Sequence, residues 1–227
     1  KNFSKRYKKL LDNQKEKKME TIEDAIVQVK KNCTTKFDES IDASFLLNMK
    51  LKKGEFNLRT VVNLPNGNGK KIKVAVLCEE SKIKEAKESG ADQFGSDTLV
   101  NDITNGKINF DKLVATPGMM PKMGKLGKIL GPKGLMPNPK LGTVTNNIKS
   151  TVKSLKSGQI EIKNDKDGNV GASIGKKSFP DAKIVENFKS LIQSISKEKP
   201  NGIKGDFILS AFLTSTMGIS YKLKLRD

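Results

Sequence analysis

The chain contains no histidine, and cysteine and arginine are scarce among its 227 residues. Without histidine there is no imidazole to act as a general base, to complete a Ser-His-Asp triad or to bind a metal. Two cysteines, Cys33 and Cys78, cannot form a four-ligand zinc site. Their wide separation predicts reduced, buried thiols in a cytosol-like compartment, although the sequence also allows a disulfide. We therefore expect neither a metal nor a cofactor.

Long apolar runs are also missing. No run approaches the roughly 18 residues of a membrane span, and no apolar core of a signal peptide is visible. A basic protein of anionic membrane surfaces would need a clustered amphipathic helix with aromatic residues facing the lipid, and none is evident. A membrane is therefore not among the expected partners.

Acidic residues are absent from one long segment, between Lys112 and Gln159. Half of the net charge of +18 lies there, on nine lysines: Lys112, Lys122, Lys125, Lys128, Lys133, Lys140, Lys149, Lys153 and Lys156. A positive field of this size predicts a polyanionic partner. The alternative is a lysine-favouring composition whose charges are merely solvated, but such a bias would not separate the signs along the chain.

The pattern of apolar residues predicts a change of architecture along the chain. In the first third, 21–32 is predicted as a helix, 41–51 as a half-buried strand and 58–64 as its antiparallel partner, after a basic start that is either a flexible arm or a helix. The middle third reads as strand, helix, helix, strand and helix at 72–78, 81–88, 96–105, 113–115 and 146–156. In the last third we expect a hairpin of 160–163 and 170–174 around NDKDGN, a helix from Pro180, and strands at 207–213 and 221–225.

These elements predict a two-domain α+β protein. Residues 1–66 and 159–227 form a discontinuous α+β domain with an antiparallel sheet and helices. Residues 67–158 form an inserted three-layer α/β domain of Rossmann-like type, with hinges near 67–69 and 157–158.

The segment TPGMMPKMGKLGKILGPKGLMPNPKLGT, residues 116–143, is rich in glycine, proline, lysine and methionine. We predict an ordered loop, neither helix nor strand. It matches neither the phosphate loop nor the dinucleotide fingerprint. GKLG and GPKG do match the Gly-x-x-Gly loop of KH domains, a weak signal. Lysines among glycines could neutralise an RNA backbone, and the alternative is a surface loop pinned by its apolar residues.

KLGKILGPKGLMPNPKLGT after LVATP resembles the signature of the ribosomal protein L-one family, the stalk proteins of the large ribosomal subunit. Supporting segments occur in order along nearly the whole chain: TTKFDESI, LPNGNGK, IKEAKESGAD, NDKDGN with IGKKSF, KPNGIKG and STMG. The resemblance implies a ribosomal location in a bacterial cytosol or organelle, with no enzymatic activity. It also implies binding to the stalk of large-subunit rRNA, help in releasing deacylated tRNA from the exit site, and possible repression of the protein's own mRNA. The free protein would be a monomer, and its partners would include other ribosomal components.

The resemblance places the main RNA contacts in the discontinuous domain, at Lys36 and Phe37 in TTKFD and at Ser215, Thr216, Met217 and Gly218 in STMG. Phe37 can pack against sugars or bases, although an ordinary core residue is the alternative. Lys36 can meet phosphate, the two hydroxyls can bond to ribose 2′-hydroxyls, and Gly218 lets RNA come close. Weaker candidates are Lys163 and Lys166, and a secondary basic loop comprises Lys122, Lys125, Lys128, Lys133 and Lys140. The competing functions are a nucleotide-binding α/β enzyme and a generic KH-like RNA-binding protein.

Overall fold

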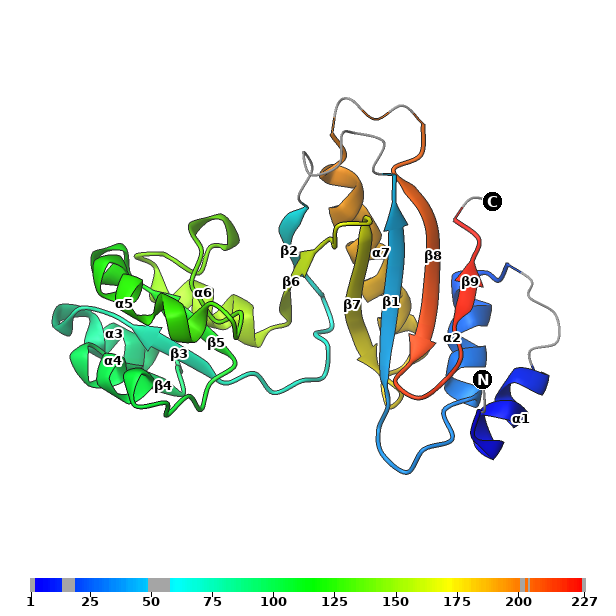
Figure 1. Ribbon diagram of the computed structural model, residues 1–227, viewed down its shortest axis with the longest axis horizontal. Helices are drawn as coiled ribbons and strands as arrows, with labels where there is room; N and C mark the ends of the chain where they lie inside the picture. The colour runs from blue at the N-terminus through cyan, green and yellow to red at the C-terminus, as the bar shows by residue number, and fades with distance from the viewer. Residues whose placement is uncertain (1–2, 14–18, 49–57, 201–202, 204, 226–227) are drawn as a thin grey trace. The chain divides into compact units, whose positions relative to one another are not determined.

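The computed structural model describes residues 3–13, 19–48, 58–200, 203 and 205–225. The chain divides into two compact units, which we describe separately. The first unit is Lys1–Gly69 with Ile160–Asp227, and the second unit is Lys70–Gln159. One contains an antiparallel sheet and the other a parallel sheet, each with helices, so the fold is mixed α/β (Figure 1).

The first unit is built on a four-stranded antiparallel sheet in the order β7-β1-β8-β9. Alternate residues of β1 are buried on one face of this sheet, and they form the predicted stripe from Ile41 to Leu47. The predicted stripe continues to Met49 and Leu51, which lie outside the described residues. The strands are β1 (Ser40–Leu47), β7 (Asn169–Lys176), β8 (Ile208–Ser215) and β9 (Tyr221–Leu223).

Two helices, α2 (Ile22–Lys31) and α7 (Asp181–Lys197), cover this buried face (Figure 1). The hydroxyl of Thr21 caps α2, which lies in the helix predicted at 21–32, by accepting a hydrogen bond from the amide of Asp24. Phe188 of α7 stacks on Phe45 of β1 with ring centroids 5.6 Å apart. The basic start forms a helix, α1 (Lys5–Asn13), which is anchored in the same core by Leu10.

The predicted pairing of the first two strands is wrong. β2 (Arg59–Asn63) pairs with β6 (Gln159–Lys163) in a separate two-stranded sheet. Both edges of β1 are occupied by strands from the last third, β7 and β8, while Val62 of β2 joins the core from outside this sheet. Residues 160–163 and 170–174 are strands, but they belong to different sheets and share only the bridge between Asn164 and Val170.

The second unit contains a parallel sheet in the order β4-β3-β5. Alternate residues of β3 point to opposite faces, so that Ala75 and Leu77 contact one pair of helices while Val74 and Val76 contact the other. The strands are β3 (Val74–Leu77), β4 (Gln93–Gly95) and β5 (Lys112–Ala115). The helices are α4 (Asp97–Thr104) and α5 (Met120–Leu130) on the first side, and α3 (Ile83–Glu88) and α6 (Ile148–Lys156) on the second. Three residues of 3-10 helix, Glu80–Lys82, precede α3.

The prediction of an irregular loop at 116–143 is wrong for a large part of that segment. Residues Pro117–Met119 form a 3-10 turn, α5 follows directly, and a second 3-10 turn covers Pro139–Leu141. Met119, Met123, Leu126 and Leu130 recur at helical spacing and are buried against the sheet. Their burial offsets the helix-weakening effect of the interior glycines, which stand on the exposed side. The motif GKLG therefore lies inside a helix and is not a KH-type loop.

Both cysteines are free and buried, as predicted: Cys33 lies in the first unit and Cys78 in the second. Burial raises the pKa of each thiol. Within the described residues no group of three or more acidic or thiol side chains could hold a metal ion. None of the described helices is long and apolar enough to cross a membrane.

Candidate nucleic-acid interface

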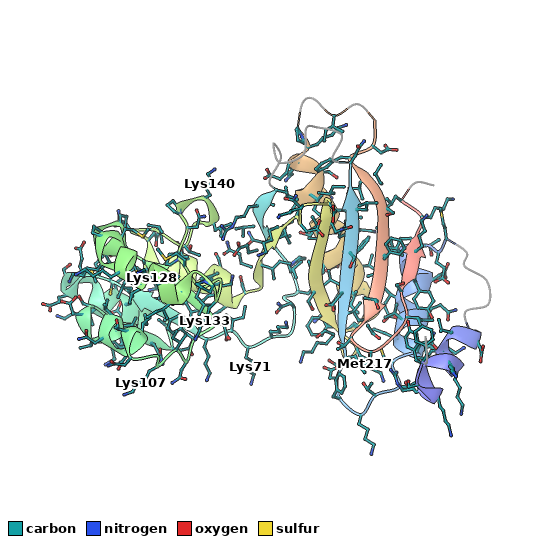
Figure 2. The ribbon with its side chains drawn as sticks, in the orientation of Figure 1. Lys71, Lys107, Lys128, Lys133, Lys140 and Met217 are labelled. Carbon is teal, nitrogen blue, oxygen red and sulfur yellow. The ribbon has the colours of Figure 1, made fainter. Side chains whose placement is uncertain are left out.

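Two loops meet at one end of the antiparallel sheet in the first unit. The loop 33–39 leads into β1, and the turn 216–218 follows β8, which runs antiparallel beside β1. The amide of Ser40 donates to Oγ1 of Thr216 at 3.0 Å, and the amide of Thr216 donates back to the carbonyl of Ser40 at 3.1 Å. These bonds, between Ser40 and Thr216 at a separation of 176 residues, bring the segments TTKFD and STMG to one surface, which we call the loop site; Met217 marks it in Figure 2.

A buried carboxylate, Glu39, lies under the loop site. Its Oε2 accepts hydrogen bonds from the hydroxyl of Ser215 (2.7 Å) and the amide of Met217 (3.1 Å). Its Oε1 accepts from the amide (3.3 Å) and hydroxyl (2.8 Å) of Thr35. Burial raises the pKa of Glu39, but the hydrogen bonds from Ser215, Thr35 and Met217 lower it by more, so it lies below its usual value. One carboxylate thus joins both loops.

The loop site presents two large apolar side chains to solvent. Phe37 is 52% exposed and Met217 is 48% exposed, and Lys36 beside Phe37 is also exposed. Phe37 is therefore not a core residue. Gly218 has no side chain for a steric reason, since an added Cβ would overlap Oγ of Ser215. Ser215 itself is buried, and its hydroxyl is donated to Glu39. The structure therefore places Ser215 as a support of the loop site.

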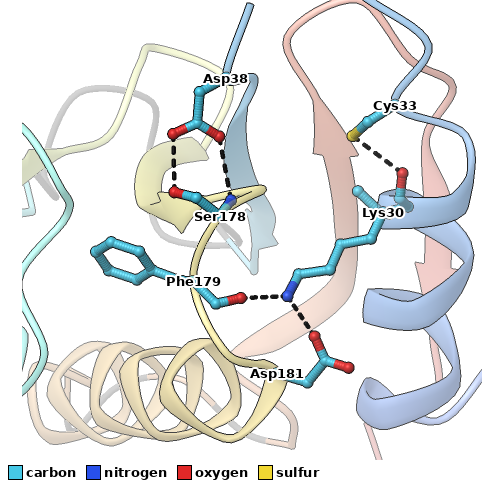
Figure 3. A network of polar contacts seen from close by, with 7 residues as sticks. Lys30, Cys33, Asp38, Ser178, Phe179 and Asp181 are labelled. Atoms are coloured by element: carbon cyan, nitrogen blue, oxygen red, sulfur yellow. Dashed lines mark hydrogen bonds and ion pairs between the residues drawn. The ribbon is translucent and has the colours of Figure 1, made fainter.

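A third segment, the turn before α7, holds the loop 33–39 from its other side (Figure 3). The carboxylate of Asp38 accepts hydrogen bonds from the amide (3.1 Å) and hydroxyl (2.8 Å) of Ser178. Nζ of Lys177 donates to the carbonyl of Cys33 at 2.8 Å. Lys30 of α2 donates to the carbonyl of Phe179 and pairs with Asp181. The backbone around Phe37 is thus held at several points while its ring remains exposed.

Lys163 and Lys166 are not brought to the loop site. Lys163 ends β6, and Lys166 lies in the turn 165–169 that follows. The amide of Leu47 donates to the carbonyl of Gly168 in that turn. Leu47 ends β1, whereas Ser40 at the loop site begins it. A strand of eight residues spans roughly 23 Å at about 3.3 Å per residue, so these two lysines lie far from Phe37.

The five lysines predicted as a secondary basic loop lie in the second unit and have different surroundings (Figure 2). Lys122 pairs with Asp97 of α4, with Nζ 2.5 Å from Oδ1. Lys125 and Lys128 lie on the exposed side of α5, away from its buried stripe. Lys133 follows α5 and Lys140 lies in the later 3-10 turn, both exposed.

Two residues that hold the loop site together, Glu39 and Arg6, are not predicted from the sequence. Glu39 occupies a position in TTKFDES that looks like an ordinary surface acid. Arg6 lies in α1 and donates from Nη1 to Oγ1 of Thr34 (3.1 Å) and from Nη2 to the carbonyl of Met217 (2.7 Å). A compositional signal for Arg6 existed, because the chain has only three arginines.

Comparison with known proteins shows the family of the chain. The model of the ribosomal protein L1p/L10e family matches residues 29–219, which include both loops of the loop site but not α1. The chain belongs to this family. Its location is therefore the ribosome, and the L1p/L10e proteins are a structural class rather than enzymes.

Several members of the L1p/L10e family are similar to the chain over nearly its full length. Large ribosomal subunit protein uL1 of Pelagibacter ubique is 60% identical, covering 98% of this chain and 97% of that protein. The uL1c protein of Phaeodactylum tricornutum is 47% identical, with coverages of 98% and 96%. The uL1 protein of Prochlorococcus marinus strain NATL1A is also 47% identical, with coverages of 100% and 96%.

Proposed function

We propose that the chain is a constituent of the large ribosomal subunit and binds the stalk of its rRNA through the loop site. In that position it helps to release deacylated tRNA from the exit site. We also propose that it represses its own mRNA when that message presents a fold like the ribosomal site. The free protein acts as a monomer whose discontinuous domain carries the main RNA contacts.

One observation carries the proposal: Phe37 and Met217 are both exposed, and they lie on two loops that share one buried carboxylate, Glu39. Exposed apolar side chains on a rigid support offer flat and curved surfaces against which bases and sugars can pack. The entropy cost of ordering these loops has already been met in the free protein, so less of it opposes binding.

Polar groups around the apolar pair suit an RNA backbone. Lys36 can neutralise a phosphate. The hydroxyl of Thr216 accepts from the amide of Ser40 and donates to its carbonyl at 3.3 Å, which leaves one acceptor position for a ribose 2′-hydroxyl. Gly218 has no side chain, so a nucleotide could come close to the backbone at this position.

The second unit contributes a weaker contact. Lys125, Lys128, Lys133 and Lys140 are exposed, and no acidic residue occurs between 112 and 159. We propose that this basic face, on a three-layer α/β domain of Rossmann-like type, adds sequence-independent attraction to RNA. Lys163 and Lys166 at the far end of β1 are proposed only as additional backbone contacts.

The test is a nuclease-protection experiment with the purified chain and large-subunit rRNA. We expect one defined stalk fragment to be protected, and Phe37→Ala to abolish its protection. Leu209→Ala is the matched control, because Leu209 is also 52% exposed but is the second residue of β8, near the end of the strand opposite to Ser215. Equal loss with both variants, or no defined fragment, would contradict the proposal.

A further inference from the structure

The side chain of Arg6, in α1, connects the two halves of the loop site. Its guanidinium donates from Nη1 to Oγ1 of Thr34 at 3.1 Å, on the loop that carries Phe37. It donates from Nη2 to the carbonyl of Met217 at 2.7 Å, on the turn after β8. One planar group therefore bridges two loops that lie 183 residues apart, from Thr34 to Met217.

The use of arginine here is informative because lysine is this chain's default cation. Only three of its 43 basic residues are arginines, namely Arg6, Arg59 and Arg226. Arg59 makes a side-chain ion pair through Nε to Glu161 at 2.8 Å, and Arg226 lies outside the described residues. An ammonium on a flexible stem cannot hold two acceptors in a fixed plane, whereas a guanidinium can.

The charge of Arg6 is not matched by an ion pair within the described residues. Both of its acceptors are neutral oxygens, and they use two of its five N–H donors. The helix that carries Arg6 is fixed in place, since Leu10 is buried in the core of the first unit. A preorganised cation with free donors therefore stands next to the exposed side chain of Met217.

We infer that the RNA-binding site extends onto α1, where Arg6 clamps the two loops and uses its remaining N–H donors to hold an RNA phosphate. This inference rests on the proposed function of the loop site. Arg6 is then both a positioning residue for Met217 and a direct contact to the ligand. Phosphate is the group that fits, because a planar fork binds its oxygens in pairs.

The experiment measures the affinity of the full chain for the stalk RNA fragment between about 50 and 300 mM KCl. Over this range the dependence of affinity on salt reports the release of counterions from RNA phosphates. We expect Arg6→Gln to lower the affinity about ten- to hundredfold and to reduce the slope of log K against log salt by about 0.7–0.9, the loss of one phosphate contact. Arg6→Lys keeps the positive charge but not the planar guanidinium. Its affinity should therefore lie between those of the wild type and Arg6→Gln, with the salt slope of the wild type.

The matched control is Lys8→Gln. Lys8 lies two residues further along α1, on the opposite side of the helix, and is exposed. Its removal deletes one charge as well, and we expect little change in affinity. An unchanged affinity for Arg6→Gln, or a lower affinity with an unchanged slope, would overturn the inference. If the wild-type chain does not bind the fragment, the proposed function itself fails, whereas binding that is insensitive to Arg6 removes only the inference.

Discussion

The hydroxyl of Ser215 donates to Oε2 of Glu39 over 2.7 Å, and both side chains are buried at the end of the sheet. Ser215 ends β8 and Glu39 immediately precedes β1, so this bond ties the two strands together where their loops diverge. The same carboxylate oxygen also accepts from the amide of Met217. The position of the exposed Met217 therefore depends on the buried carboxylate of Glu39.

Glu39→Gln should destabilise the first unit and weaken RNA binding. The amide of glutamine can accept through only one of its two terminal atoms, so donors now facing Oε1 or Oε2 lose their acceptor. A buried donor without an acceptor costs about 1–3 kcal/mol. Chemical denaturation gives the loss in free energy of unfolding, and a binding titration with the stalk fragment gives the loss in affinity. A fully stable variant with normal affinity would show that Glu39 does not support the loop site.

The stability that Glu39 contributes should depend on pH in a defined direction. Its pKa is lower in the folded protein than in the unfolded chain, because the hydrogen bonds from Ser215, Thr35 and Met217 outweigh burial. This contribution is therefore complete above the unfolded pKa of about 4.3 and is lost as the pH falls through the folded value. The difference in unfolding free energy between wild type and Glu39→Gln should shrink when the pH is lowered from 7 to 3. A difference that stays constant would contradict this assignment.

Gly218→Ala should damage the loop site more than its small size suggests. The new Cβ would overlap Oγ of Ser215, and moving that oxygen breaks its bond to Glu39. We expect a loss of about 1–3 kcal/mol in stability together with weaker RNA binding. Gly171→Ala in β7 is the control, since nothing lies within 4 Å of its added Cβ. Similar thermal unfolding of both variants would contradict a clash between the added Cβ at position 218 and Oγ of Ser215.

Gly124→Ala should stabilise the second unit. Gly124 lies inside α5 with open space around an added Cβ, so alanine gains helix propensity of about 0.5–1 kcal/mol without a clash. Gly134→Ala is the contrasting variant, because φ is +67° at Gly134 and alanine would be strained there. Thermal unfolding of the two variants should therefore shift in opposite directions, and a decrease for Gly124→Ala would show that the exposed side of α5 is not open.

Local patterns predicted most elements correctly, and the errors have physical causes. The stripe of α7 and the cap of α2 are determined by neighbours within a few residues, so the sequence reveals them. The partner of β2 depends on contacts across about 100 residues, to β6, and no local pattern records that choice. In and just before α5, a stripe of four buried residues at helical spacing lies among glycines and prolines, whose composition is typical of a loop.

Some residues at the loop site can be predicted from the sequence, and others are revealed only by the fold. Phe37 and Met217 could be named from the family resemblance, while their exposure is a property of the fold. Glu39 could not be found, because a buried carboxylate and a solvated one look alike in a sequence. Lys163 and Lys166 are the weaker candidates in the sequence, and the register of β1 with β7 separates them from the loop site.

The most direct test of the account compares two double variants in stalk-RNA affinity at one salt concentration. Thr216→Val with Met217→Ala alters the loop site without changing charge, whereas Lys125→Gln with Lys128→Gln removes two positive charges from α5. We expect the first pair to lose at least about tenfold more affinity, since site contacts at a rigid surface outweigh solvated charges. A larger loss for the lysine pair would contradict the claim that the first unit holds the RNA.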